Sequence, residues 1–338
     1  MDKKEVLYSK NQINKAAKIY CSETKSQEEE AEARKKINNW RAAHAFPLQI
    51  IYCHIKKTVG NKGIVAQRLK RLTSIEKKLK RFPAMALCTM QDIGGCRVIV
   101  DDIDGVYNLV EKLKTSRMRH KLKEEYDYIE RPKADGYRSY HLSYAYFSDR
   151  NTKYNGLCIE IQIRTHIQHL WATAVETMDA FTGEALKNGS GSEINREFFK
   201  IASKLLEVYE KSDKDIEVVK RSEFAKEMKK FDSENHVISR LETIRESIIK
   251  ADKDAFANEG YYLLKLNSKT HNLDIEYFMP VQASKATDEY DKYEKERGIY
   301  EDIVLVSTLS YDDLQKAYPN YFTDIAEFND LMKKFVID

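Results

Sequence analysis

The chain lacks the features that mark disulfide-stabilised, zinc-dependent or membrane-spanning proteins. Its five cysteines are scattered without a CxxC pair, which favours reduced thiols over disulfides or zinc ligands. No apolar run approaches the ~18 residues of a membrane-spanning helix, and the first residues lack the apolar segment of a signal peptide. The net charge of +3 is too small to indicate a committed nucleic-acid binder. We therefore expect a cytoplasmic protein with no membrane partner and no DNA partner.

The chain does have the composition of a globular protein, with 33% charged and 42% hydrophobic residues. Its 338 residues are enough for two domains. Helical periodicity covers residues 9–57, 64–81, 103–114, 166–181 and 193–210, and strand patterns cover 96–100, 119–126, 139–147 and 157–163. Strands interleaved with helices predict an α/β (α+β) domain over residues 1–215, with a mixed sheet flanked by helices.

A second, smaller α+β domain is expected over residues 222–338. Residues 212–230 are dense in charge and lack Gly and Pro, which predicts a helical linker. Beyond it we expect a helix at 236–256, a hairpin of strands at 261–267 and 273–278, a helix at 283–297, a strand at 302–307 and a last helix at 324–336.

The segment from Asp127 to Thr165 holds the densest functional signal. It reads DYIERPKADGYRSYHLSYAYFSDRNTKYNGLCIEIQIRT, in which a Gly-Tyr-Arg-Ser turn precedes two alternating runs. Glu160 stands inside the second, otherwise apolar run, and Gln162 and Arg164 share its face because strand side chains alternate with period two. An isolated Glu there would be a solvent-facing residue of an edge strand.

This segment resembles the synthetase domain of the RelA/SpoT family. The family signature is a DYI-x-x-PK-x-x-GYRS-x-H loop followed by EIQIRT, and both blocks are present. The resemblance implies a nucleotidyltransferase-like fold and a pyrophosphokinase that uses Mg²⁺ and ATP. Glu160 matches the catalytic Glu that shares the metal and activates the attacking 3′-hydroxyl, and Tyr137 matches the Tyr that stacks on the acceptor base.

Other residues of the same segment are expected to contact the substrate. His141 lies near Glu160 either as a substrate contact or as a structural hydrogen-bonding residue. The remaining candidates are Arg138, Gln162 and Arg164.

The ATP side of the site is predicted upstream. Arg68, Lys70, Ser74 and Lys78 are expected on one helix, the last three on one face. Such a run is usually a solvated charged face, but the family has the pattern R-x-K-x-x-x-S-x-x-x-K here, where it grips the triphosphate of ATP.

Asp92 and Arg97 belong to the segment QDIGGCRV. An Asp before Ile-Gly-Gly is often only a turn residue. In the family motif DI-x-G-x-R, however, the Asp binds Mg²⁺ and the Arg stacks on adenine opposite the residue matching Arg68, a role that suits a planar guanidinium. The chain has no His-Asp dipeptide, the signature of the family's hydrolase domain, so the resemblance implies synthesis only. A zinc site at the His166 and His169 pair would need further ligands.

Three further segments resemble the CapRel group, in which a toxic RelA/SpoT-type enzyme is fused to its antitoxin domain. They are WRAAHAFPL at 40–48, HLWATAVETMDAFTGEALKNGSG from His169, and AYPNYFTD at 317–324. The resemblance implies pyrophosphate transfer to the 3′ end of tRNA, which halts translation, and release by a phage structural protein. It also implies a degenerate zinc finger, consistent with the absence of cysteine after Cys158. Tyr318 and Tyr321 are expected to block the ATP site between Arg68 and Arg97; a helix-capping turn with both rings packed in the small domain is the alternative.

The acceptor stays open at this point. Lys121 and Lys123 lie in a basic stretch that suits an RNA backbone but is equally a solvated surface. A GDP or GTP acceptor would make the protein an alarmone synthetase. A non-catalytic RNA-binding module is disfavoured because the phosphate, metal and base positions are all filled.

Overall fold

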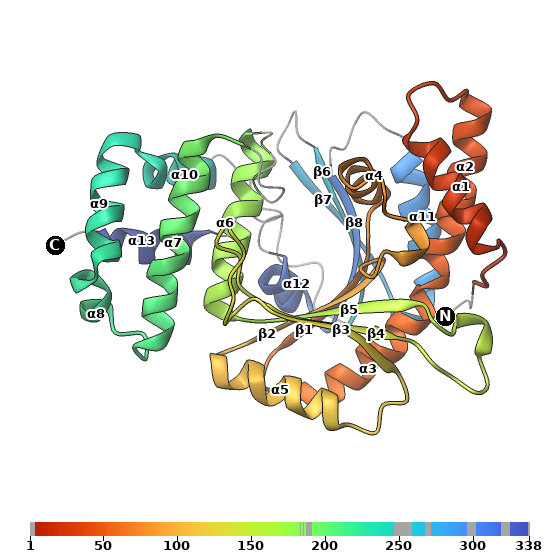
Figure 1. Cartoon of the computed structure of the whole chain (residues 1–338), viewed down its shortest axis with the longest axis horizontal. Helices are drawn as coiled ribbons and strands as arrows, with labels where there is room; N and C mark the ends of the chain where they lie inside the picture. The colour runs from red at the N-terminus through yellow and green to blue at the C-terminus, as the bar shows by residue number, and fades with distance from the viewer. Residues whose placement is uncertain are drawn as a thin grey trace.

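The computed structural model describes residues 4–182, 184, 186, 191–246, 259–267, 272–295, 302–318 and 325–336. Its centre is one eight-stranded sheet in the order β3-β4-β5-β2-β1-β8-β6-β7 (Figure 1). The strands are β1 (Ile64–Leu69), β2 (Gly94–Val100), β3 (Lys121–Asp127), β4 (Tyr140–Ala145), β5 (Cys158–Thr165), β6 (Gly260–Asn267), β7 (Asn272–Phe278) and β8 (Asp302–Thr308). The β2 and β5 strands pair in parallel and the other neighbours are antiparallel. The predicted mixed sheet flanked by helices is confirmed.

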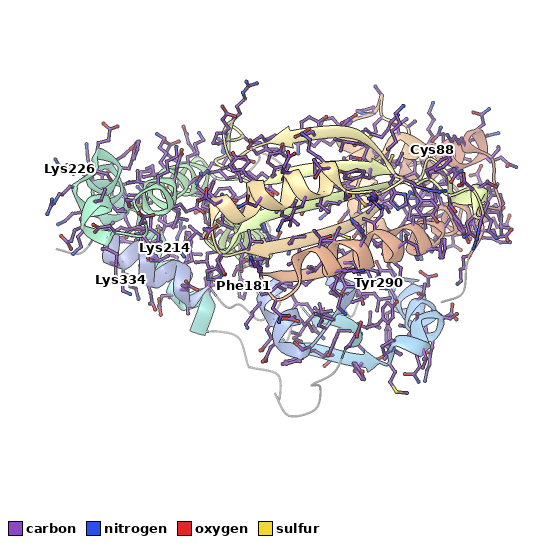
Figure 2. The ribbon with its side chains drawn as sticks, turned by 90° about the horizontal axis from the view of Figure 1, so that it is seen from below. Cys88, Phe181, Lys214, Lys226, Tyr290 and Lys334 are labelled. Atoms are coloured by element: carbon purple, nitrogen blue, oxygen red, sulfur yellow. The ribbon has the colours of Figure 1, made fainter. Side chains whose placement is uncertain are left out.

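One face of the sheet is closed by apolar helices. The helices α3 (Ala45–Val59) and α5 (Ile103–Thr115) bury Ile51, Ile55 and Val106 against alternate residues of β2, β4 and β5. Figure 2 shows both helices lying across this face. The helix α11 (Ala283–Lys295) packs on the strands β6 and β8 through Ala286 and Tyr290. This layering leaves the opposite face of the central strands for polar side chains.

The opposite face is framed by three helices, α4 (Leu72–Arg81), α6 (His166–Thr182) and α12 (Tyr311–Ala317). They lie above the sheet in Figure 1, with α3 and α5 below it. The α12 helix was not predicted; it packs Leu314 and Ala317 against Ala66 and Val306 of the sheet. The candidate site lies on this face.

At one end of the molecule, α1 (Lys10–Cys21) and α2 (Gln27–Ala43) form a helical hairpin that packs on α4. Both helices begin at capping boxes, at Ser9 and Ser26, in which the serine side chain and the third helical residue satisfy each other's backbone N–H. Buried Ile13, Ile37 and Ile75 join the hairpin to α4.

At the other end, α6 and four later helices surround α7 (Glu193–Lys211). These are α8 (Ile216–Arg221), α9 (Glu223–Asn235), α10 (Val237–Glu246) and α13 (Ala326–Val336). Figure 2 labels Lys226 and Lys334 in this layer. The predicted helical linker at 212–230 is helical, but it is not a linker: α8 and α9 pack in the core through the apolar residues Val219, Ala225 and Met228.

The largest secondary-structure error concerns residues 64–81, predicted as one helix. Residues 64–69 form β1, which pairs with β2 on one side and β8 on the other. Only Leu72, Ile75 and Leu79 carry a helical apolar stripe, and they belong to α4. Arg68 is therefore on a strand, Lys70 is in the connection, and Ser74 and Lys78 alone share the helix.

Most of the remaining predictions agree with the structure within a few residues. The helix predicted at 236–256 is observed as α10 as far as Glu246, and residues 247–256 lie outside the described residues. The β6–β7 pair is the expected hairpin, and α11, β8 and α13 occupy the expected positions. The C-terminal strands continue the central sheet through the β1–β8 pair, and a division into domains near residue 215 stays a prediction. In the part of the chain that the structure describes, no helix is long and apolar enough to cross a membrane.

Candidate active site

Strand register lays out the site on the open face of the sheet. One row of cross-strand neighbours runs through Glu124, Ser143, Glu160, Gly95 and Arg68. Because cross-strand partners project to the same face, these residues meet side by side.

The next row contains Tyr126, His141, Gln162 and Arg97. Side chains of both rows line a cavity of about 920 Å³. A volume near the top of the usual ligand range leaves room for more than one nucleotide.

Asp92 lies in the turn directly before β2 and holds two ammonium groups. Lys70 Nζ donates to one carboxylate oxygen at 2.7 Å and Lys78 Nζ to the other at 2.9 Å. Burial raises the pKa of Asp92, but the two lysines outweigh it and lower the pKa to about 2. The backbone N–H of Lys70 donates to the Ile93 carbonyl at 2.8 Å, which ties the β1–α4 connection to this turn. The structure thus brings the predicted triphosphate lysines and the predicted metal ligand together.

Glu160 is held by its neighbours on the sheet face. Gln162 Nε2 donates to one of its carboxylate oxygens at 2.7 Å, and His141 Nδ1 lies 3.2 Å from the other. Since a carboxylate only accepts, His141 donates from Nδ1, and its Nε2 lies 2.9 Å from the Tyr137 hydroxyl. Burial raises the pKa of Glu160, but the His141 and Gln162 hydrogen bonds hold it below its usual range. Glu160 is therefore ionised at neutral pH and able to accept a proton.

The two carboxylates suit a magnesium ion. Asp92 and Glu160 line one small cavity of about 50 Å³, and between them stands Gly95, whose missing side chain leaves the space open. Carboxylate oxygens are the ligands that Mg²⁺ prefers. No group of three or more His, Cys, Asp or Glu suited to a metal occurs among the described residues, so a bound ion would complete its shell from water and substrate phosphates.

Arg68 and Arg97, the pair predicted to hold adenine, both contact the ring of Tyr318. Their guanidinium carbons lie 5.7 Å and 4.9 Å from the ring centroid, within cation–π range. Tyr318 is fully buried and also lines the small cavity beside Asp92 and Glu160. It directly follows α12, whose last carbonyl, that of Ala317, accepts from Arg97 Nη1 at 2.7 Å.

Arg164 is a second buried cation at the cavity wall. Burial, followed by the charge of Arg97, lowers the pKa of Arg164 to about 9, so it stays charged at neutral pH. Its Nε has no hydrogen-bond partner among the described residues. A buried cation with an unused donor beside a cavity suits an anionic ligand group.

Aromatic rings form the other side of the cavity. Tyr137 follows Gly136, whose φ of +91° favours glycine and where a Cβ would approach the Ser203 Cβ to 2.9 Å. Its ring packs edge-on against Trp171 at 6.3 Å, and burial raises the pKa of its hydroxyl. Lys133 Nζ lies 5.0 Å from the same ring.

Several predicted residues do not line the cavity. Arg138 turns away from it and donates from Nη1 to Glu210 at 2.8 Å, both side chains being only 4% exposed. Ser74 is half-buried one turn before Lys78 on α4. Lys121 and Lys123 are exposed on the edge strand β3. Tyr321 lies outside the described residues.

The His166 and His169 pair serves contacts between distant segments. His166 Nε2 lies 2.7 Å from a Glu327 carboxylate oxygen on α13, and His169 Nε2 donates to the Lys316 carbonyl of α12 at 2.6 Å. Burial and two nearby arginines lower the pKa of His169 well below its usual value, so it is neutral. Together with Arg97, His169 satisfies the C-terminal carbonyls of α12.

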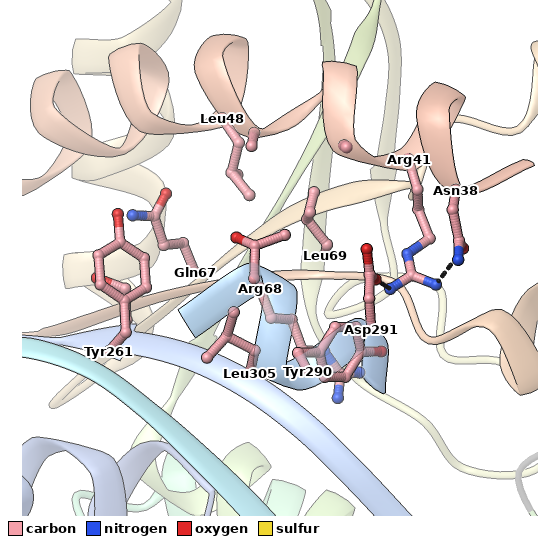
Figure 3. A pocket seen from close by; sticks show the side chains of 14 residues that line it. Asn38, Arg41, Leu48, Gln67, Arg68, Leu69, Tyr261, Tyr290, Asp291 and Leu305 are labelled. Atoms are coloured by element: carbon pink, nitrogen blue, oxygen red, sulfur yellow. Dashed lines mark hydrogen bonds and ion pairs between the residues drawn. The ribbon is translucent and has the colours of Figure 1, made fainter. Parts of the chain in front are cut away.

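A smaller cavity of about 50 Å³ lies on the other face of the sheet, between α2, α3 and α11 (Figure 3). Arg41 at its edge is buried and bonds Glu294 at 2.7 Å, with Asp291 at 3.7 Å. Burial lowers the pKa of Arg41, but Glu294 outweighs it and raises the pKa. The second oxygen of Glu294 accepts from the Leu72 N–H at 2.8 Å, the first N–H of α4. The helix that carries Lys78 is thus capped by a residue from α11.

Sequence reasoning missed several cavity residues, including Tyr126, Tyr128, Lys133, Trp171 and Glu176. Tyr128 and Lys133 lie within the DYI-x-x-PK block, so the signal was present, but which side chains face the cavity depends on strand register.

Residues 67–179 match the RelA_SpoT family model, the region found in RelA and SpoT proteins. The matched residues include the cavity residues from Arg68 to Glu176.

Two relatives come from Bacillus subtilis. The chain is 33% identical to the GTP pyrophosphokinase YjbM over 117 residues. The aligned stretch covers 34% of this chain and 55% of that relative. It is 35% identical to the GTP pyrophosphokinase YwaC over 112 residues. That stretch covers 31% of this chain and 52% of that relative. The chain therefore spans about half the length of each relative.

Solved structures similar to this chain include small alarmone synthetases of the same organism. Small alarmone synthetase 2 has a TM-score of 0.43 and 24% identity, covering 53% of this chain and 95% of that one. Small alarmone synthetase 1 bound to its product pppGpp has a TM-score of 0.43 and 24% identity, and the match covers 52% of this chain and 92% of that one.

Proposed function

We propose that this protein is a pyrophosphokinase that transfers pyrophosphate from ATP to the 3′-hydroxyl of tRNA. The hydroxyl oxygen attacks the β-phosphorus, the bond from that phosphorus to the oxygen it shares with the α-phosphorus breaks, and AMP leaves. Glu160 accepts the hydroxyl proton, and Lys70, Lys78 and Arg68 hold the phosphates. Mg²⁺ held by Asp92 and Glu160 supplies charge neutralisation at the phosphates.

One observation carries the proposal. Asp92 and Glu160 face the same small cavity, with the lysine pair on one side and the Glu160–His141–Tyr137 chain of hydrogen bonds on the other. This arrangement supports the proposal, because phosphoryl-group transfer needs a base, metal-binding carboxylates and phosphate-binding cations around one point.

The acceptor assignment rests on the shape of the acceptor side. The cavity reaches Glu124 and Tyr126 of the edge strand β3, and Lys121 and Lys123 are exposed outside the cavity on the same strand. Cations outside the cavity suit a polyanion, which gains affinity from contacts beyond its terminal nucleotide. Such modification of tRNA would inhibit translation.

A fused regulatory segment is the second part of the proposal. The ring of Tyr318 occupies the position between α12 and the Arg68–Arg97 pair where adenine is expected to bind. A partner that binds the C-terminal segment, such as a phage structural protein in anti-phage defence, would withdraw Tyr318 and shift the closed form to an open one. Tyr321 is proposed to act with it.

The test is a label-transfer experiment. ATP labelled in the γ-phosphate is incubated with bulk tRNA and, separately, with GDP or GTP, using the parent chain and a chain with Tyr318 and Tyr321 replaced by Ala. The proposal expects label on tRNA, and more of it from the double variant. A folded double variant as inactive as its parent would refute the closed form.

A second candidate is synthesis of an alarmone from GDP or GTP. The observation that favours it is the half-buried ring of Tyr137 with Lys133 Nζ 5.0 Å from its centroid, an aromatic ring and a cation that suit one purine nucleotide. Label on GDP or GTP, with none on tRNA, would select this candidate.

A further inference from the structure

Two tyrosines beyond Tyr137 form a ready-made stacking surface. The rings of Tyr126 and Tyr128 are parallel, with an interplanar angle of 3° and centroids 5.7 Å apart. Tyr126 is 46% exposed, and its hydroxyl donates to Glu124, which fixes the orientation of the ring. Both tyrosines line the large cavity.

These rings are not packing residues of the fold. Neither belongs to a hydrophobic cluster found among the described residues, whereas Tyr140 and Tyr144 of the neighbouring strand are buried in one. Tyr126 is exposed and Tyr128 is half-buried, so burial of apolar area does not account for holding the two rings in parallel.

The pair continues the acceptor side of the site outward. Tyr128 meets Tyr137 edge-on at 6.1 Å and His141 at 5.2 Å. Lys133 Nζ lies 4.4 Å from the Tyr128 ring and 5.0 Å from the Tyr137 ring. One cation therefore sits between two aromatic positions, where the phosphate that links two consecutive nucleotides would lie.

The place of β3 in the sheet keeps this surface open. It is the outermost strand of the sheet in the described part of the chain, and Tyr126 is exposed on it. A β-bulge at Lys123 also shifts the register, which brings Lys121 onto the same face as Tyr126. A single nucleotide seated on Tyr137 would leave this surface unused, but a chain that continues from it would pass over it.

We infer that Tyr126 and Tyr128 bind the unpaired bases that precede the 3′-terminal nucleotide of the acceptor, with Lys133 on the linking phosphate. Base–aromatic stacking is tolerant of sequence and is the usual way that proteins hold single-stranded nucleic acid. The inference rests on the proposed RNA acceptor and narrows it to RNA with a single-stranded 3′ end.

The test measures binding to the full chain without ATP. The probe is a fluorescein-labelled trinucleotide, cytidine-cytidine-adenosine, followed by fluorescence anisotropy; unlabelled adenosine 5′-monophosphate and GDP compete for it. Tyr126→Ala and Tyr128→Ala should each lower the affinity for the trinucleotide on the order of tenfold. The affinity for the competing mononucleotides should stay within about twofold of wild type.

Two control variants separate stacking from structure. Tyr126→Phe keeps the ring and should bind the probe within about twofold of wild type. Tyr107 is a 38% exposed tyrosine that bonds Asp127 from α5 at 3.0 Å, and Tyr107→Ala should leave probe binding unchanged.

The outcomes distinguish the two proposals. If wild type binds the trinucleotide and both alanine variants bind it equally well, the stacking surface is refuted while the RNA acceptor stands. If the alanine variants lose as much affinity for the mononucleotides as for the trinucleotide, the stacking surface is also refuted. If wild type binds no RNA and passes label to GDP or GTP alone, the RNA acceptor fails and this inference fails with it.

Discussion

The two sides of the candidate active site differ in what occupies them. On the proposed ATP side, Tyr318 covers Arg68 and Arg97, and the lysines are paired with Asp92. On the proposed acceptor side, Tyr137 and Tyr128 line the large cavity, with Lys133 beside both rings. Both sides are preorganised by the same strands, so the difference comes from a segment more than 200 residues away in sequence that fills one side only.

The largest expected effect comes from the residue where the two sides meet. Glu160→Gln keeps the shape and removes the charge that accepts the hydroxyl proton, so transfer should fall on the order of 10²-fold or more. Initial rates of label transfer measure this in a chain that also carries Tyr318→Ala. ATP binding should survive. Glu125→Gln, a matched change on the other face of β3, should leave the rate unchanged, and wild-type-like transfer by Glu160→Gln would remove Glu160 from its proposed role.

Two arginines near the acceptor side should respond in opposite ways. Arg138→Ala leaves the buried Glu210 without its ion-pair partner, so the free energy of unfolding should drop by about 3 kcal/mol or more. Arg164→Met removes a buried cation that lies beside Arg97, so stability should be unchanged or increased, while anionic acceptors bind more weakly.

Urea unfolding of both variants, with acceptor binding in parallel, checks this pair. Equal destabilisation by both changes would show that Arg164 is also a structural residue.

The pairing of Asp92 on the ATP side predicts a pH dependence of stability. Its pKa falls from 3.8 to about 2, which corresponds to about 2 kcal/mol of stabilisation. Because the folded pKa is the lower one, this contribution is complete above about pH 4 and disappears as the pH falls towards 2.

Asp92→Asn should therefore be less stable than wild type at neutral pH, and the gap should close in acid. Urea titrations across that pH range measure the gap; a difference independent of pH would contradict the pairing of Asp92 with the two lysines.

The smallest expected effect lies at the outer edge of the acceptor side. Reversing the charge at Lys121 and Lys123 should weaken the binding of tRNA. The slope of log K against log salt should become less steep by about 1 to 2, since each phosphate contact on a single strand contributes about 0.7. A GDP or GTP reaction should be nearly unchanged. Equal loss for both acceptors, or none for either, would count against RNA contacts at this edge.

Local patterns in the sequence predicted the centre of the site. Period two in β5 correctly placed Glu160, Gln162 and Arg164 on one face, and the glycine before Tyr137 correctly indicated a turn. Residues 64–69 were misread because their apolar side chains fit a helix or a strand equally well, and pairing with β2 and β8 decides between them.

Long-range contacts account for the rest. The bulge at Lys123 breaks strict alternation on β3, so the sequence pattern could not show that Lys121 and Tyr126 share a face. Glu294 caps α4 from more than 200 residues away, and nothing near Leu72 indicates it. Arg138 reads as a substrate residue beside Tyr137, yet its side chain points to Glu210 because adjacent residues of an extended chain face opposite ways.

The contrast between a filled ATP side and an open acceptor side is the central claim, and ATP affinity tests it most directly. Calorimetry with Mg²⁺ and a non-hydrolysable ATP analogue should compare the parent chain, Tyr318→Ala and Tyr318→Phe. Removing the ring exposes Arg68 and Arg97, so Tyr318→Ala should bind the analogue about tenfold or more tightly than the parent. Tyr318→Phe keeps the ring and should bind like the parent. Equal affinity in all three folded chains would show that Tyr318 does not close the ATP side.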